Sequence, residues 1–434
     1  MALFFCFQQD SLLPKGLRIT KFNIFLSNIF SFLDQAVEAS QKKYLKDFTF
    51  FRDEFIKQKS DFLEINLEKM KIILYEKGNI KKEFNILLKG DPYDWGGTAS
   101  GIYKITSGYE RAYSSIAKVY MPYALGFYGK YYIHGEPYYA SGQKLISDAS
   151  GGCLRLSNKD AKDLYNMTSI DLPVVVIDKE NGNYFAIEKT EPPLITAQSY
   201  LVVDLDSGFI FAEKDAELKR QIASITKLMT ALTISEHLDL RKTILARDYM
   251  LEGFGQTEGL EAGKRFGIVE LFYPLLRESS NDAAYVLSYF LGKERTLKLM
   301  NEKAKSILML ESFFADPSGY DTRNVSTAKD LYYLARYIFL NRPLLFNITK
   351  GDDVSSFRDV SFKNLWNKNI FSQDESFLGG KTGFIKTSRY TGIFLFKMQQ
   401  RNIVIIVLGS NMQKDLKTDV QKLYIWLENN YFKE

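Results

Sequence analysis

The sequence predicts a multidomain chain in which a mostly-β domain is followed by an α/β domain. Short alternating runs of apolar and polar residues begin near Phe62 and continue to about 105, which is typical of consecutive strands. Helical patterns fill about 224–345, and apolar strands lie before and after them in the chain. Because strands at both ends enclose the helices, we expect one sheet whose edge strands come from distant parts of the sequence. A chain of 434 residues can bury the two or three cores that this organisation needs.

The composition excludes several classes of protein. Apolar residues make up 46% and charged residues 25% of the chain, as in ordinary soluble globular proteins. The net charge of +5 is mild for this length, and with no basic cluster in the sequence we expect no nucleic-acid partner. Only two cysteines occur, Cys6 and Cys153, so a disulfide framework is excluded.

Residues 1–57 are expected to form an N-terminal helical segment. The apolar run Phe22–Leu33 follows three basic residues and weakly imitates a signal peptide, although an amphipathic surface helix explains it equally well. No apolar run reaches the ~18–20 residues of a membrane span. The segment is therefore a possible export or anchor region, and any membrane contact is expected there.

Residues 58–190 are predicted to form the first domain, called here the cysteine domain because it carries Cys153. A turn at 76–79 and paired glycines punctuate its apolar runs. The expected strands cover 65–67, 70–75, 84–88 and 102–105.

Cys153 lies in a glycine-rich loop, and His134 ends a predicted strand upstream of it. A thiolate is a strong nucleophile, and an adjacent histidine cation lowers the pKa of a thiol. A single cysteine is more often a small buried hydrophobe, and a single histidine is more often structural. The occurrence of two scarce residue types in neighbouring motifs strengthens the catalytic interpretation, and the structural interpretation stays open at this point.

Residues 60–179 resemble the L,D-transpeptidase catalytic domain, whose members cross-link peptidoglycan through a cysteine. The resemblance is carried by Thr-Ala-Ser-Gly-Ile-Tyr-Lys-Ile at 98–105 and by Leu-Arg-Leu-Ser-Asn-Lys-Asp-Ala at 154–161. It implies that Cys153 is the nucleophile and that His134 is its base.

The same resemblance implies further roles in the loop before and after the cysteine. Ser150 stands at the motif serine, Arg155 anchors the donor peptide, and the N–H groups of Gly152 and Cys153 face the oxyanion. Gly151 departs from the family, which usually has histidine there, so a lower rate or an altered specificity is expected. A domain that binds glycan without catalysis is the alternative.

The second domain, residues 195–434, is called here the serine domain. A stiff Glu-Pro-Pro connector at 191–193 marks its boundary. A β-hairpin is expected at 200–212, two apolar strands at 390–396 and 402–409, and a final helix from about Leu416.

Ser224 and Lys227 stand at the head of a predicted helix with one face in a core. Their spacing of three places them on one helical face, neighbours across one turn. Serine is a weak nucleophile unless a base takes its proton, and a lysine can do so when desolvation lowers its pKa. Taken alone, the pair also fits a solvated polar face.

Two distant motifs complete a set of three. Ser-Ser-Asn follows at 279–281, and Lys-Thr-Gly at 381–383. In this order the motifs resemble serine-type D-alanyl-D-alanine carboxypeptidases of the penicillin-binding-protein superfamily. The stretches at 316–320 and 325–330 are also similar to that family, which implies an α/β sandwich of the β-lactamase/penicillin-binding-protein type.

The resemblance assigns chemistry to the first two motifs. Ser224 attacks the carbonyl of a terminal D-Ala-D-Ala bond, and Lys227 takes its proton. Ser279 and Asn281 border the site and assist proton shuttling and peptide binding.

The third motif binds the substrate. Lys381 offers a fixed positive charge and Thr382 a hydroxyl to the terminal carboxylate, while Gly383 allows close approach of the strand. The N–H groups of Ser224 and Phe384 are expected to form the oxyanion hole.

Together these resemblances imply a bifunctional peptidoglycan-modifying enzyme of the cell envelope. It would act on stem peptides, be inhibited by β-lactams, and need no metal or organic cofactor. A class A β-lactamase shares the serine motifs, and a wall-binding scaffold with decayed sites is the alternative from another class. An export signal is weak or missing in the sequence.

Overall fold

The protein is described by a computed structural model that covers residues 45–179, 190–251, 257–354, 356–357, 362 and 365–432. All of these residues belong to one compact unit, 43–434. The apolar run Phe22–Leu33 and Cys6 lie outside the described residues. Helix α2 (Phe48–Lys57) agrees with the helical expectation for the end of the first segment. Among the described residues no helix is both long and apolar enough to cross a membrane.

The cysteine domain contains two sheets, which confirms its β-rich character. The first has the order β3-β2-β1-β9-β4, and the second has the order β5-β6-β7-β8. Helix α3 (Asn158–Met167) follows the second sheet in sequence, and Ser157 caps its N-terminus. The strands are β1 (Phe62–Asn66), β2 (Lys71–Glu76), β3 (Asn79–Asn85), β4 (Gly101–Lys104), β5 (Ser107–Ser114), β6 (Val119–Tyr128), β7 (Tyr131–His134), β8 (Leu154–Arg155) and β9 (Pro173–Ile177).

One predicted strand of this domain is placed differently. The strand expected at 84–88 begins earlier, as β3, and ends at Asn85. Beyond it the chain leaves the first sheet, because Leu87 N donates to Arg155 O at 2.8 Å and Arg155 N donates to Leu88 O at 2.9 Å. The apolar run 84–88 thus serves two sheets and connects the first sheet to the cysteine motif.

The serine domain is built on one five-stranded sheet of order β11-β10-β18-β17-β16. Strand β10 (Ser199–Asp204) pairs antiparallel with β18 (Arg401–Ser410), so the sheet joins distant parts of the chain as predicted. Its other strands are β11 (Ile210–Lys214), β16 (Phe377–Ile385) and β17 (Arg389–Met398).

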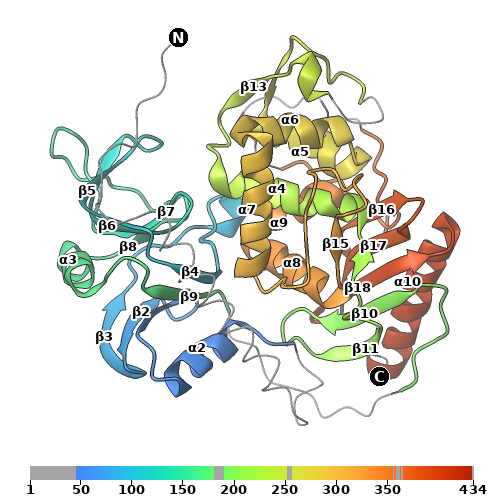
Figure 1. Cartoon of the computed structure of the whole chain (residues 1–434), viewed down its shortest axis with the longest axis horizontal. Coiled ribbons are helices and arrows are strands. Elements are labelled where there is room, and N and C mark those ends of the chain that lie inside the picture. Colours follow the sequence, from blue (N-terminus) through green and yellow to red (C-terminus); the bar gives the residue numbers. More distant parts are fainter. Residues whose placement is uncertain are drawn as a thin grey trace. The chain divides into compact units, whose positions relative to one another are not determined.

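Helices cover both faces of this sheet (Figure 1). Apolar residues of α10 (Gln413–Leu427) share one core with alternate residues of β10, β17 and β18. The remaining residues of these strands share the opposite core with α4 (Thr226–His237), α8 (Ala328–Asn341) and α9 (Pro343–Lys350). This alternation places a sheet between two helical layers, which is the α/β sandwich that the sequence predicted.

The region 224–345 is mostly helical, as expected, but it also contains short strands. Its further helices are α5 (Ile268–Tyr273), the π-helix η4 (Pro274–Glu278), α6 (Asn281–Leu291) and α7 (Lys293–Ser306). The small strands are β12 (Arg220–Gln221), which pairs with β15 (Val325–Ser326), and β13 (Thr243–Leu245), which pairs with β14 (Arg265–Gly267).

Candidate active sites

Ser224 lies in a short 3-10 turn, η2 (Ala223–Ile225), directly before α4. The sequence predicted a helix with one buried face, but burial extends around the whole helix: every residue of α4 except His237 is buried. Its polar side chains find partners inside the core, as when Thr230 Oγ1 donates to Pro317 O at 2.6 Å. The serine is thus held at the head of a rigid helix in the middle of the domain.

Lys227 connects the first motif to the second. Its Nζ lies 2.9 Å from Ser224 Oγ and 2.8 Å from Asn281 Oδ1. A third partner is the carbonyl oxygen of Ser318, at 2.6 Å. Asn281 is placed by the start of α6, which Ser280 caps. These three contacts fix the amine against the serine hydroxyl.

The surroundings of Lys227 prepare it to accept a proton. The side chain has no exposed surface, and burial lowers its pKa to about 7, with Lys368 adding to the effect and Asp316 opposing it. Near neutral pH a large fraction of the amine is therefore uncharged. An uncharged amine beside Ser224 Oγ can act as its general base.

Lys381 connects the third motif to the second. Its Nζ donates to Ser279 Oγ at 2.9 Å and to Thr382 O at 2.7 Å. Burial, together with Lys227 and Lys368, lowers its pKa well below the usual range. The expectation of a fixed positive charge therefore needs an anionic ligand, whose carboxylate would restore the ammonium form.

Strand β16 brings Gly383 against the nucleophile. A Cβ on Gly383 would lie 2.9 Å from Ser224 N and 2.8 Å from Ile222 O, so only glycine allows this approach. An open cavity of about 1050 Å³ lies in front of the strand. The predicted residues that line it are Ser224, Ser279, Asn281, Thr382, Gly383 and Phe384.

The cysteine site is built on the parallel pair β7 and β8. Ile133 pairs with Leu154 and His134 with Arg155, which places Cys153 beside Tyr132 and on the same face as His134. Both residues line a second cavity, of about 310 Å³. The structure therefore brings the predicted pair to one cavity, although no hydrogen bond joins their described side chains.

The resting protonation of this pair differs from the expectation of a thiolate beside an imidazolium. Burial lowers the pKa of His134 to about 4 and raises the pKa of Cys153. Cys153 Sγ lies 3.7 Å from Lys130 O, to which a thiol can donate. His134 Nδ1 lies 2.6 Å from Gly135 O, which favours a proton on Nδ1 and leaves Nε2 as acceptor. The pair is a neutral thiol and a neutral base.

The cysteine loop, residues 149–153, is held by its own serine. Ser150 Oγ donates to Cys153 O at 2.6 Å, and Gly152 N donates to Ser150 Oγ at 3.3 Å. Gly152 has a φ of +107°, and a Cβ there would lie 2.2 Å from Tyr131 Cε1. At Gly151 a Cβ would meet nothing within 4 Å. Crowding does not explain the missing histidine.

Arg155 lies at the cavity with unused hydrogen-bonding capacity. One of its terminal nitrogens, Nη1, donates to Ser147 O at 3.0 Å, whereas Nε is buried and has no hydrogen-bond partner among the described residues. An arginine placed in this way suits an anionic ligand.

Sequence reasoning missed several residues at the two sites. The carbonyl of Ser318 was hidden within a stretch noted only for its resemblance to the family. No motif in the sequence marked Lys130 as a site residue, although its carbonyl faces the thiol. Residues of the serine domain, Asp239, Leu240 and Arg241, line the cysteine cavity, and only the tertiary structure shows this.

Comparison with known families agrees with this geometry. The family described as D-alanyl-D-alanine carboxypeptidase matches residues 186–412, just over half of the chain. The chain belongs to this family. A second family, described as L,D-transpeptidase catalytic domain, matches residues 60–176. The carboxypeptidase-family chain is therefore a fusion with an L,D-transpeptidase domain.

Curated relatives and solved structures match the carboxypeptidase part. D-alanyl-D-alanine carboxypeptidase DacB2 of Mycobacterium tuberculosis is 31% identical over 49% of this chain and 74% of the relative. A D-alanyl-D-alanine endopeptidase of Haemophilus influenzae is 32% identical over 51% of this chain and 77% of its own length. The crystal structure of a D-alanyl-D-alanine carboxypeptidase from Mycobacterium tuberculosis has a TM-score of 0.51 at 28% identity, covering 55% of this chain and 93% of that one.

Proposed function

We propose that the chain is a bifunctional peptidoglycan-modifying enzyme. The Ser224 site removes the terminal D-Ala from pentapeptide stems, and the Cys153 site uses tetrapeptide stems for L,D-transpeptidation. The observation that carries the proposal is the contact of Lys227 Nζ with both Ser224 Oγ and Asn281 Oδ1, in a chain that also carries the transpeptidase domain.

The carboxypeptidase reaction follows from the contacts around Ser224. Neutral Lys227 takes the hydroxyl proton as Ser224 Oγ attacks the carbonyl of the penultimate D-Ala. The N–H groups of Ser224 and Phe384 donate hydrogen bonds to the developing oxyanion, at ~3–4 kcal/mol for each donor. The C–N bond then breaks, the proton passes to the departing D-Ala amine, and water hydrolyses the ester.

Substrate binding depends on the third motif. The terminal carboxylate lies against Lys381 and the hydroxyl of Thr382, and its negative charge favours the ammonium form of Lys381. Ser279 accepts a hydrogen bond from Lys381. It therefore links the residue that binds the carboxylate to the proton transfer at Ser224.

The transpeptidase reaction uses the neutral pair. His134 Nε2 takes the thiol proton as Cys153 Sγ attacks the carbonyl of the third stem residue, and the terminal D-Ala leaves. Arg155 anchors the donor, and the N–H groups of Gly152 and Cys153 stabilise the oxyanion. The proton held by His134 passes to the departing D-Ala amine. An acceptor amine then attacks the thioester carbonyl, the C–S bond breaks, and the amine proton returns to the thiolate through His134 as the amide cross-link forms.

The two reactions form a sequence. Trimming a pentapeptide gives the tetrapeptide that the Cys153 site consumes, and the shared chain raises the effective concentration of the second site near the trimmed stem. These activities place the enzyme in the cell envelope, with β-lactams as expected inhibitors of the serine site.

A product analysis of three proteins tests the relay. Wild type, Ser224→Ala and Cys153→Ala are incubated with pentapeptide or tetrapeptide wall fragments, and the products are analysed by mass spectrometry. Ser224→Ala should cross-link tetrapeptides only, and Cys153→Ala should trim pentapeptides and stop there. The relay is wrong if Ser224→Ala cross-links pentapeptides as well as wild type does.

A penicillin assay distinguishes the alternatives. A carboxypeptidase should form a durable ester at Ser224, seen as one adduct by intact mass. Rapid release of hydrolysed penicillin without trimming would instead indicate a β-lactamase-like hydrolase. A folded protein that neither labels nor hydrolyses penicillin would fit a wall-binding scaffold.

A further inference from the structure

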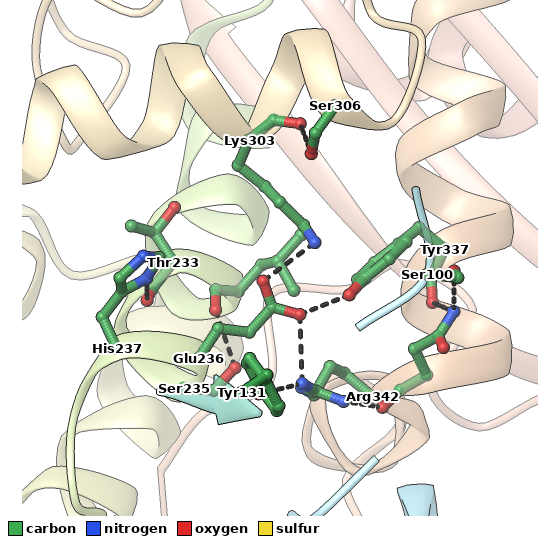
Figure 2. Close-up of polar contacts among 12 residues, drawn as sticks. Ser100, Tyr131, Thr233, Ser235, Glu236, His237, Lys303, Ser306, Tyr337 and Arg342 are labelled. Atoms are coloured by element: carbon green, nitrogen blue, oxygen red, sulfur yellow. Dashed lines mark hydrogen bonds and ion pairs between the residues drawn. The ribbon is translucent and has the colours of Figure 1, made fainter. Parts of the chain in front are cut away.

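A buried charge cluster occupies the end of α4 that lies opposite Ser224 (Figure 2). The carboxylate of Glu236 lies 2.9 Å from Lys303 Nζ and 3.1 Å from Arg342 Nη2. The hydroxyl of Tyr337 also donates to it. The three charged side chains have no exposed surface. Burial would raise the pKa of Glu236, but the two cations hold it at about 2, so the carboxylate stays charged.

Both cations of this cluster also reach the cysteine domain. Arg342 Nη2 donates to Tyr131 OH at 2.5 Å, and Lys303 Nζ donates to Tyr103 OH at 3.1 Å. Figure 2 shows that Tyr131 and Glu236 both contact the same terminal nitrogen, Nη2, of Arg342. The cluster thus joins the two domains through hydrogen bonds that water cannot reach.

The tyrosine that Arg342 holds is the one on which the cysteine loop rests. Gly152, directly before the nucleophile, lies so close to Tyr131 that any side chain would collide with the ring. A second set of contacts leads from Arg342 to the cysteine loop through Gly97, where a Cβ would lie 2.6 Å from Arg342 Nη1. A Cβ on its neighbour Gly96 would likewise lie 2.6 Å from Ser150 O, so the backbone at Gly96 is packed against the cysteine loop. The cysteine loop is therefore supported by Tyr131 and by the backbone at Gly96 and Gly97, and Arg342 packs against both supports.

The serine domain also forms part of the wall of the cysteine cavity. Asp239 and Arg241, in the segment after α4, line this cavity, and Arg241 Nη2 donates to Ile116 O at 3.2 Å. Lys130 of the cysteine domain contacts the serine domain in turn, because its Nζ donates to Leu238 O at 3.0 Å. Its own carbonyl faces Cys153 Sγ.

We propose that the serine domain completes the cysteine site, with Arg342 as the positioning residue that fixes the cysteine loop through Tyr131. The proposal rests on the transpeptidase function proposed for Cys153. It adds that this function requires the neighbouring domain, whatever the activity at Ser224.

A positioning role predicts two changes of opposite sign. Without Arg342 the loop loosens, so the partly buried thiol becomes more accessible and its raised pKa falls toward the ordinary value. Alkylation by iodoacetamide should then become faster near neutral pH. Acyl transfer should become slower, because a displacement of about 1 Å costs up to ~100-fold in rate. Simple loss of stability does not produce this pair of effects in protein that remains folded.

The experiment compares full-length variants. Arg342→Gln removes the guanidinium, and Tyr131→Phe removes only the hydroxyl that receives it. The matched control is Arg336→Gln, because Arg336 is also buried and pairs with Asp178 of the cysteine domain at 3.2 Å, away from the cysteine loop. Penicillin labelling of Ser224 verifies the fold, and digestion with mass spectrometry measures alkylation of the Cys153 peptide against pH.

Arg342→Gln and Tyr131→Phe should raise the alkylation rate several-fold, shift its pH midpoint downward and lower kcat of transfer about tenfold or more at similar KM. Arg336→Gln should leave the alkylation profile within about twofold of wild type. Profiles like wild type in both test variants would overturn the proposal. If Arg342→Gln fails to label at Ser224, Tyr131→Phe decides, since it keeps the ring and every charge. A wild type without transfer activity would refute the transferase function, while the alkylation profiles would still decide the positioning role.

Discussion

Lys227 shows how a residue usually charged in water becomes a base inside a protein. No part of its side chain is exposed, and its three hydrogen-bond partners are neutral oxygens of Ser224, Asn281 and Ser318. Burial therefore outweighs the opposing influence of Asp316 and lowers the pKa to about 7. The amine that accepts a proton is the deprotonated form, so the activity of Ser224 should increase with pH.

The first prediction is that acylation of Ser224 by penicillin rises with pH with a midpoint near 7, because that is the pKa of Lys227. Lys227→Arg keeps a cation that does not lose its proton, so acylation should fall by ~10²–10⁴ at every pH. Stopped-flow or quenched mass measurements give the rates. A flat profile between about pH 5.5 and 8.5 would contradict the role of Lys227 as base.

The second prediction concerns Gly151, where the family that the cysteine domain resembles usually has histidine. Because a Cβ there meets nothing within 4 Å, Gly151→His should fold with an unchanged Tm. It restores a polar side chain beside the oxyanion N–H groups, so kcat of L,D-transfer should rise several-fold. A stable variant with unchanged or lower kcat would show that glycine at position 151 does not lower the rate of transfer.

At the scale of elements, α4 shows what a pattern can and cannot predict. Leu228, Ala231 and Leu232 predicted a helix with a buried face, and the helix is present. A solvated polar face was the alternative for Ser224 and Lys227, yet Lys227 is buried, and so are the polar residues Thr230 and Glu236 of the same helix. Their partners, Pro317 for Thr230 and Arg342 for Glu236, are distant in sequence. No local pattern distinguishes a polar group satisfied inside a core from one that faces water.

Strand β16 gives the third prediction. Gly383→Ala places a methyl group 2.9 Å from Ser224 N, where it blocks one of the two proposed oxyanion donors. Acylation of Ser224 should fall by ~10²–10³, the usual cost of one lost donor. The alkylation rate of Cys153 in the same protein serves as the internal control and should not change. Acylation like that of wild type would exclude Ser224 N from the oxyanion hole.

At the scale of the whole molecule, the three serine motifs were predictable because their spacing is carried by short, specific stretches. Ser224, Asn281 and Lys381 converge as these motifs imply, through Lys227 and Ser279. The neutral state of the Cys153 pair was not predictable, because it depends on burial by residues that no motif marks. Cavity walls supplied by the other domain were hidden for the same reason.

The fourth prediction concerns the stability of the whole chain. Glu236→Gln leaves Lys303 and Arg342 buried without their carboxylate, which should lower the free energy of unfolding by ~3–5 kcal/mol. Since the pKa of Glu236 falls from an ordinary 4.5 to about 2 on folding, its stabilisation is complete above pH 4.5 and is lost as the pH falls toward 2. Chemical denaturation over this range should show a steeper loss in wild type than in the variant. Equal slopes would indicate that the carboxylate does not stay charged.

The pairing of β10 with β18 has a consequence for the order of synthesis. The described strands of the cysteine domain end at Ile177, whereas the sheet of the serine domain closes only after residues 401–410 have been synthesised. Domains fold as units during synthesis, so the first can form while the second still waits for its last long strand. Arg342 and Glu236 belong to that later domain. A growing chain therefore carries its thiol before it carries the residues that hold the thiol loop in place, and the cysteine site is completed only after the domain that follows it has formed.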